Sequence, residues 1–244
     1  MTGAGAPEAE ASWGIMGAAL AAYRGGDRDA VLQMRTDVGG VEDVPVALFF
    51  RSPKEMGGVE RWALDHASGR TLDLGAGPGA IAIPLAAKGV AVTAVEVVPE
   101  ARDALRDGGI SDVRAGGLET LAEDERFDTV LVLMNGTGLA GTLERLPSFL
   151  EELARLLASG GQLLVDSTDP RDWDDQDDGR YPGDVHMQLG FRGAWGEPFP
   201  FVFVDPDTLA EAAASVGLRA DFVAAEEDGR YLARLTFPPP GPTS

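Results

Sequence analysis

The strongest constraint on this chain is a short apolar run that ends in three glycines, Thr71-Leu72-Asp73-Leu74-Gly75-Ala76-Gly77-Pro78-Gly79. Glycines let the backbone turn with positive φ, and they let a ligand approach the main chain closely. A helix that begins behind such a loop presents free N–H groups to a polar or anionic ligand. The run therefore predicts a strand, a ligand-binding loop and a helix. Its third glycine comes one residue too early for the dinucleotide fingerprint G-x-G-x-x-G.

The segments on either side of this run have the patterns of an α/β protein. The small apolar residues 80–87 predict a helix packed on a sheet, and Gly89 suits its C-terminal end. Glu96 follows the next apolar run at about 20 residues from the glycine loop, where an acid can accept hydrogen bonds from ribose hydroxyls. Beyond 71–74, strands are predicted over 90–95, 113–115, 127–134 and 161–166.

Four motifs in this order resemble the class I S-adenosylmethionine-dependent methyltransferases: Leu72 to Gly79, Glu96, Phe127 to Val130, and Leu157 to Leu163. The resemblance covers residues 60 to 168 well. It implies an α/β fold with a seven-stranded, mostly parallel Rossmann-like sheet that ends in an antiparallel hairpin. It also implies S-adenosyl-L-methionine as cofactor and S-adenosyl-L-homocysteine as product. The early third glycine and the acid inside the strand favour this cofactor over NAD.

The resemblance implies cofactor-binding residues at the C-terminal ends of the strands. The three glycines would hold the methionine part, Glu96 the ribose hydroxyls, and Asp73 would orient the loop. Gly116-Gly117-Leu118 replaces the aspartate that bonds adenine in such families, so backbone groups or Glu119 are expected to make that contact. The full expected set is Asp73, Gly75, Ala76, Gly77, Gly79, Glu96, Val97, Gly117, Leu118, Met134, Asn135 and Gly136.

Residues that would bind or activate the methyl acceptor lie outside this core. Methyl transfer depends mainly on alignment, and a base is needed only if the acceptor must lose a proton. His186 is the candidate base, with an ordinary strand histidine as the alternative, whereas His66 is expected to be solvated or to cap a helix. Candidate substrate-binding residues are Tyr23, Arg51, Arg192 and Trp195, with a surface ion pair as the alternative for Arg51.

The charge balance narrows the class of partner. With 40 acidic and 20 basic residues the chain has a formal net charge of −20, whereas nucleic-acid binders use a basic face to neutralise phosphates. We therefore expect a small-molecule acceptor and no nucleic acid. No membrane contact is expected, because no apolar run is long enough to span a bilayer. Without cysteines or a signal-peptide pattern, a cytoplasmic monomer or homodimer is expected.

Metal dependence is not expected from the sequence. Acids crowd the loop over residues 169–184, but the spacing of an EF-hand is absent, so a solvated loop is the interpretation. Asn135 and Asp166 stand where catechol-type methyltransferases place metal ligands, and they form an incomplete set.

One domain is expected over residues 11–237, between a disordered tail (1–10) and a Pro-rich tail (238–244). Its parts are a helical cap (11–67), the cofactor-binding core (68–168), a β-rich lid insertion after the fifth strand (169–204), and a C-terminal helix and hairpin (205–237). The function predicted is methyl transfer to an O or N atom of a metabolite. The alternatives are a methyltransferase acting on a peptide, a non-catalytic cofactor-binding regulatory or scaffold protein, and an NAD(P)-binding oxidoreductase.

Overall fold

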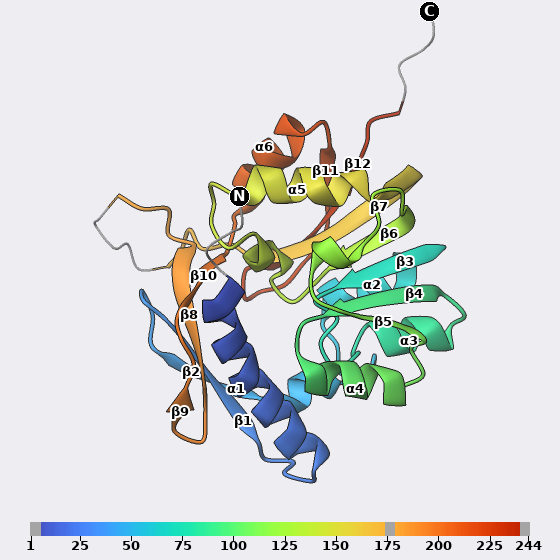
Figure 1. Ribbon diagram of the computed structural model, residues 1–244. Helices are drawn as coiled ribbons and strands as arrows, with labels where there is room; N and C mark the ends of the chain where they lie inside the picture. Colours follow the sequence, from blue (N-terminus) through green and yellow to red (C-terminus); the bar gives the residue numbers. More distant parts are fainter. Residues whose placement is uncertain (1–5, 174–178, 240–244) are drawn as a thin grey trace, which may run out of the picture.

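The computed structural model describes residues 6–173 and 179–239, and these form two sheets (Figure 1). The larger sheet has the strand order β11-β12-β7-β6-β3-β4-β5. Its parallel strands are β3 (Arg70–Leu74), β4 (Ala91–Glu96), β5 (Asp112–Ala115), β6 (Phe127–Val132) and β7 (Leu157–Thr168). Only β12 (Arg230–Thr236) runs against its neighbours β7 and β11 (Arg219–Ala225). The expected seven-stranded, mostly parallel sheet is confirmed.

The strand order changes direction at the centre of this sheet. The chain enters at β3, proceeds outward through β4 and β5, and then returns to place β6 on the other side of β3. The loops after β3 and β6 therefore diverge to opposite faces of the sheet. Ligands of open α/β sheets bind beyond the C-terminal strand ends at such a switch point.

Helices cover both faces of the larger sheet (Figure 1). Helix α5 (Leu146–Arg155) buries Leu146, Phe149, Leu150 and Leu153, the spacing of one helix face, and with α6 (Pro206–Ser215) it packs on one side. The opposite side is covered by α2 (Gly58–His66), α3 (Ala82–Ala87) and α4 (Pro99–Asp107).

The second sheet joins two segments that are far apart in the sequence. Its order is β10-β8-β1-β2, with β9 paired to β8, and all its pairs are antiparallel. The strands β1 (Val31–Thr36) and β2 (Val41–Pro45) precede the core, and β8 (Asp184–Phe191), β9 (Ala194–Trp195) and β10 (Phe199–Val202) follow it. Helix α1 (Ala6–Arg24) lies between this sheet and α4 (Figure 1).

The helical cap expected over residues 11–67 contains helices α1 and α2, but it also contains two strands that the sequence did not predict. Residues 31–45 form a β-hairpin in which the side chains of Leu32 and Met34 face the opposite way from those of Gln33 and Arg35. So short an alternation is a weak signal in a sequence. The hairpin is stabilised by pairing with β8, which lies about 150 residues further along the chain and is visible only in the tertiary structure.

Helix α6 begins at a side-chain cap, as the sequence predicts. Asp205 Oδ1 accepts hydrogen bonds from the backbone N–H groups of Asp207 and Thr208, both at 3.0 Å, and Oδ2 accepts one from the Tyr181 hydroxyl at 2.7 Å. The cap thus joins the insertion to the C-terminal part of the core. Among the described residues, no helix combines the length and apolar character that crossing a membrane requires.

Replacing Asp205 with Ala should lower the free energy of unfolding by about 1–2 kcal/mol, because two helix N–H groups and the Tyr181 hydroxyl lose their acceptor. Glu211→Ala removes an exposed acid from the same helix and should change stability by less than about 0.5 kcal/mol. Urea denaturation of both variants measures the difference. Equal effects of the two substitutions would contradict the capping role.

Candidate functional site

The glycine loop after β3 is held by the chain that follows β4. The N–H groups of Gly75 and Ala76 donate to the carbonyl oxygen of Val95 at 2.9 and 3.2 Å. The N–H of Gly77, where φ is +55°, donates to Glu96 Oε2 at 2.7 Å, and the N–H of Val98 donates to Oε1 at 2.7 Å. A carboxylate has about four lone-pair sites, so Glu96 keeps lone-pair capacity for ligand hydroxyls.

Asp73 differs from its expected role. The residue is 3% exposed, and no donor in the described part of the chain reaches its Oδ2 atom. Burial, with the charge of Glu96 as a second cause, raises the pKa of Asp73 to about 7. The hydrogen bond to the loop comes from Glu96 and not from Asp73, which corrects the expectation that Asp73 orients the glycines.

The turn after β6 has an unusual backbone. Met134 and Asn135 have φ of +65° and +59°, a left-handed conformation that costs roughly 1–2 kcal/mol for a residue with a Cβ. Two hydrogen bonds hold this turn: Thr168 Oγ1 donates to Asn135 Oδ1 at 2.8 Å, and the N–H of Gly136 donates to Asp166 Oδ1 at 3.0 Å. The turn leads into the short helix η3 (Gly136–Ala140). Strain of this kind is typical of functional sites.

Exposed apolar side chains surround these polar groups. Val97, Met134 and Leu139 are 39–43% exposed and belong to the segments after β4 and β6. A methyl group placed on Gly75 would lie 3.4 Å from Leu139 Cδ1, so Leu139 stands directly beside the loop. An apolar rim around a few convergent polar groups is typical of a small-molecule site.

The residues present at this edge fit S-adenosylmethionine. Glu96 can accept hydrogen bonds from ribose hydroxyls, and the glycine loop admits a ligand close to the backbone. The apolar rim can contact the apolar parts of the ligand. Gly117 and Leu118 lie at the same edge after β5, where the N–H of Gly117 donates to Glu119 Oε1 at 2.7 Å. The structure thus gathers the expected cofactor residues at neighbouring strand ends, and their contacts to a cofactor stay a prediction.

A buried ionic network supports the turn after β6 from behind. Glu60 Oε1 accepts hydrogen bonds from both Arg51 and Arg230, and Arg230 Nε lies 3.8 Å from Asp166 Oδ2. Burial raises the pKa of Asp166 to about 6, although the Gly136 N–H and the Arg230 charge favour the ionised form. Arg51 Nη1 also lies 3.9 Å from Met134 Sδ. Arg51 is therefore part of a buried network beside the turn rather than of a surface ion pair.

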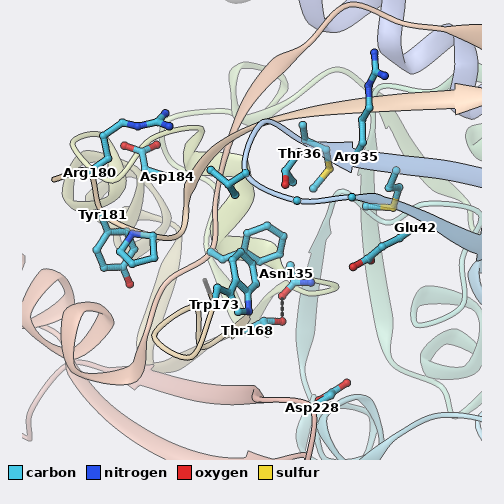
Figure 2. Close-up of a pocket in the computed structure, with 17 residues that line it drawn as sticks. Arg35, Thr36, Glu42, Asn135, Thr168, Trp173, Arg180, Tyr181, Asp184 and Asp228 are labelled. Carbon is cyan, nitrogen blue, oxygen red and sulfur yellow. Dashed lines mark hydrogen bonds between the residues drawn. The ribbon is translucent and has the colours of Figure 1, made fainter. Parts of the chain in front are cut away.

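A cavity of about 600 Å³ lies beside the same turn (Figure 2). Asn135 and Thr168 line it from the larger sheet, Met34 and Glu42 from the β1–β2 hairpin, and Trp173 and Phe203 from the insertion and the segment after β10. Its volume lies within the range of sites for small ligands, roughly 300–1,000 Å³. Of these lining residues, only Asn135 belongs to the set expected from the sequence.

The predicted acceptor residues do not line this cavity. His186 lies on the face of β8 opposite the buried Val185 and Met187, with Nδ1 3.7 Å from Asp37 Oδ2. Trp195 stacks beneath the Arg35 guanidinium, and Arg192 forms an ion pair with Asp27 at the β8–β9 turn. The position of His186 on this outer face contradicts the expectation that it stands at the pocket mouth as the base.

Tyr23 and His66, which the sequence also singled out, both have defined contacts. Tyr23 stacks on Phe50 with ring centroids 4.8 Å apart, so its ring belongs to the core beneath the second sheet. His66 lies in the last turn of α2, where Nδ1 is 2.8 Å from the Trp62 carbonyl oxygen.

The sequence also raised the question of a metal site. In the described part of the chain no group of three or more His, Asp or Glu side chains could hold a metal ion. Asp174, Asp175, Asp177 and Asp178 of the acid-rich loop lie outside the described residues.

Comparisons with known proteins agree with this geometry. The family model of a methyltransferase domain matches residues 72–165. An S-adenosylmethionine-dependent methyltransferase from Bacteroides fragilis, solved with S-adenosyl-L-homocysteine, is 33% identical, with 93% of this chain and 96% of that chain covered and a TM-score of 0.82.

Two further similarities are partial or concern the fold alone. Cypemycin N-terminal methyltransferase from Streptomyces sp is 35% identical over 122 residues, which are 48% of this chain and 50% of that enzyme. The chain thus matches about half the length of this curated relative. A sugar N-methyltransferase from Streptoalloteichus sp is 17% identical at a TM-score of 0.56, with 80% of this chain and 94% of that chain covered.

Asp73→Asn should make stability less dependent on pH. The folded pKa of about 7 exceeds the ordinary value, so the stabilisation from the bound proton is complete below about pH 4 and is lost as pH rises to about 7. From pH 5 to pH 8 the variant should lose roughly 2.5 kcal/mol less stability than the parent protein, as measured by urea denaturation. Asp172→Asn, in an exposed loop, is the control. Parallel pH curves for the parent protein and Asp73→Asn would exclude this pKa.

Arg230→Met should lower the free energy of unfolding by about 3 kcal/mol, because Glu60 and Asp166 stay buried while they lose a cation. Arg234→Met, on the same strand with a more exposed ion pair to Asp221, should cost about 1 kcal/mol or less. Adding Glu60→Gln to Arg230→Met should recover part of the loss. Additive effects in this double-mutant cycle would show that the network carries no coupling.

Proposed function

The chain belongs to the S-adenosylmethionine-dependent methyltransferases, and we propose that it transfers a methyl group to a nitrogen or oxygen atom of a small molecule. One observation carries the proposal: the glycine loop, Glu96 and the Met134–Gly136 turn converge at one edge of the sheet, and a cavity opens beside that turn. The likeness to the Bacteroides fragilis enzyme over nearly the whole of both chains supports the methyl-transfer part of the proposal and not the class of acceptor.

The residues of this chain bind and align rather than react. When bound, S-adenosylmethionine supplies an electrophilic methyl carbon on a sulfonium leaving group. Glu96 accepts hydrogen bonds from the ribose, and the glycine loop sets the depth at which the ligand lies. The strained turn at Met134 and Asn135 separates the cofactor edge from the cavity, and its hydrogen bonds to Thr168 and Asp166 fix the direction of approach. Alignment of this kind supplies most of the rate acceleration when a nucleophile displaces a good leaving group.

A small-molecule acceptor is supported by the volume of the cavity, about 600 Å³. The net charge of −20 opposes binding to a phosphate backbone. A peptide acceptor is the second candidate, supported by the resemblance of half the chain to an N-terminal methyltransferase. The cytoplasmic location and the monomeric or homodimeric state stay predictions.

Calorimetry with S-adenosyl-L-homocysteine tests the cofactor site. The parent protein should bind this ligand and should not bind NADH. Glu96→Ala should weaken binding by at least about tenfold, because the acceptor of the ribose hydroxyls is lost and the anchor of Gly77 disappears. Glu123→Ala, an exposed acid in a loop, should bind as the parent does. Unchanged affinity of Glu96→Ala in a folded protein would remove this residue from the cofactor site.

Turnover is tested with S-adenosylmethionine labelled in the methyl group and an extract of the source cells, with the products separated by size. Label in the small-molecule fraction that depends on this protein would support the proposal. Label only in peptides would favour the second candidate. Tight cofactor binding without any labelled product would favour a non-catalytic cofactor-binding protein.

A further inference from the structure

We infer that the cavity beside the Met134–Gly136 turn binds a cationic amine attached to an apolar body, and that this amine is the methyl acceptor. The inference rests on the proposed function and specifies its substrate class. It depends on the position of the cavity, on its lining, and on the placement of charge around it.

The position of the cavity connects it to the reaction. Asn135 lines the cavity and also belongs to the strained turn at the cofactor edge. Thr168 Oγ1 donates to Asn135 Oδ1, so the side chains at the base of the cavity are joined to each other across β6 and β7 (Figure 2). A group bound here therefore lies beside the turn that borders the cofactor site.

The centre of the cavity is apolar. Trp173 and Phe203 meet edge to face with ring centroids 4.9 Å apart, and Met34 and Met187 face them from the second sheet. The Tyr181 hydroxyl already donates to Asp205 Oδ2 and accepts from the Asp205 N–H, so Tyr181 contributes its ring rather than a polar contact. Aromatic faces attract both apolar groups and cations.

Carboxylates surround this apolar centre. Glu42 from β2 points into the cavity toward Asn135 (Figure 2), Asp228 lies in the turn before β12, and Asp184 begins β8. Among the described residues, no hydrogen bond or ion pair involves the carboxylates of Glu42 and Asp184. Asp228 Oδ1 accepts the backbone N–H of Arg230 at 3.1 Å.

The cations that line the cavity have partners elsewhere. The Arg35 guanidinium points away from Asn135 (Figure 2), donates to Gln188 Oε1 and stacks over Trp195 at 4.3 Å. Arg180 donates to Asp37 Oδ2 at 3.3 Å. A ligand carboxylate would therefore meet uncompensated negative charge, whereas an ammonium group would compensate it.

An amine also satisfies the chemistry of transfer. The ammonium first loses one proton to the Glu42 carboxylate, which points toward Asn135 (Figure 2), and the proton passes from there to water. The nitrogen lone pair then forms the N–C bond while the S–C bond of the sulfonium breaks. The products are a methylated ammonium and a neutral thioether, so charge and atoms balance.

The test compares three probes of similar shape and different charge: 2-phenylethylamine, 2-phenylethanol and phenylacetate. Each is titrated by calorimetry at 150 mM salt into protein saturated with S-adenosyl-L-homocysteine. The amine should bind at least about tenfold more tightly than the alcohol, and phenylacetate should bind most weakly. Equal affinities, or no binding of any probe, would overturn the inference. Failure of S-adenosyl-L-homocysteine to bind would instead contradict the proposed function, so the two failures are distinguishable.

Glu42→Gln should reduce the preference for amine over alcohol by at least about fivefold, with affinity for the alcohol and for S-adenosyl-L-homocysteine unchanged. Asp43→Asn is the matched control, because it removes the same charge from the next residue of β2, whose side chain faces away from the cavity. If Asp43→Asn has the same effect, the preference reflects the net charge of the protein and not this site.

Discussion

The carboxylate of Glu96 is the contact on which the cofactor site depends. It lies at the end of β4, yet its two oxygens accept from the N–H groups of Gly77 and Val98, so it ties the glycine loop after β3 to the neighbouring strand. Burial raises the pKa of this carboxyl group, and the two N–H groups oppose that shift by favouring the charged form. The loop is thereby held by hydrogen bonds from its backbone N–H groups to the end of β4.

Buried charge is concentrated at the same edge of the sheet. Asp73 and Asp166 are both buried, and each has one carboxylate oxygen that no hydrogen bond from residues 6–173 or 179–239 reaches. Arg230 balances Asp166 only from 3.8 Å, because its guanidinium is shared with Glu60. Groups of this kind oppose stability, and they cluster where a protein binds or reacts with a ligand. The edge is accordingly the part of the sheet least optimised for folding alone.

The acceptor side of the protein is built from segments that lie far apart in the sequence. The β1–β2 hairpin comes before the core and β8 to β10 come after it, and they meet as one antiparallel sheet. This pairing places Glu42 and Met34 opposite Trp173 and Phe203 around one cavity. The acceptor specificity proposed for the protein therefore depends on a sheet that is separate from the cofactor-binding sheet, so the two could vary independently.

The sequence by itself determined the larger sheet, the glycine loop, the position of Glu96 and the cap at Asp205, because each depends on a local pattern and on neighbours close in the chain. It did not reveal that Glu96 rather than Asp73 bonds the loop, since both acids stand at plausible positions and only the packed strands select one. It also placed His186, Arg192 and Trp195 with the acceptor, although strand alternation on β8 and the β8–β9 turn put them outside the cavity. The hairpin over 31–45, the Arg51–Glu60–Arg230 network and the cavity were decided by tertiary structure alone, because their partners lie up to about 170 residues apart and meet only when both sheets have formed.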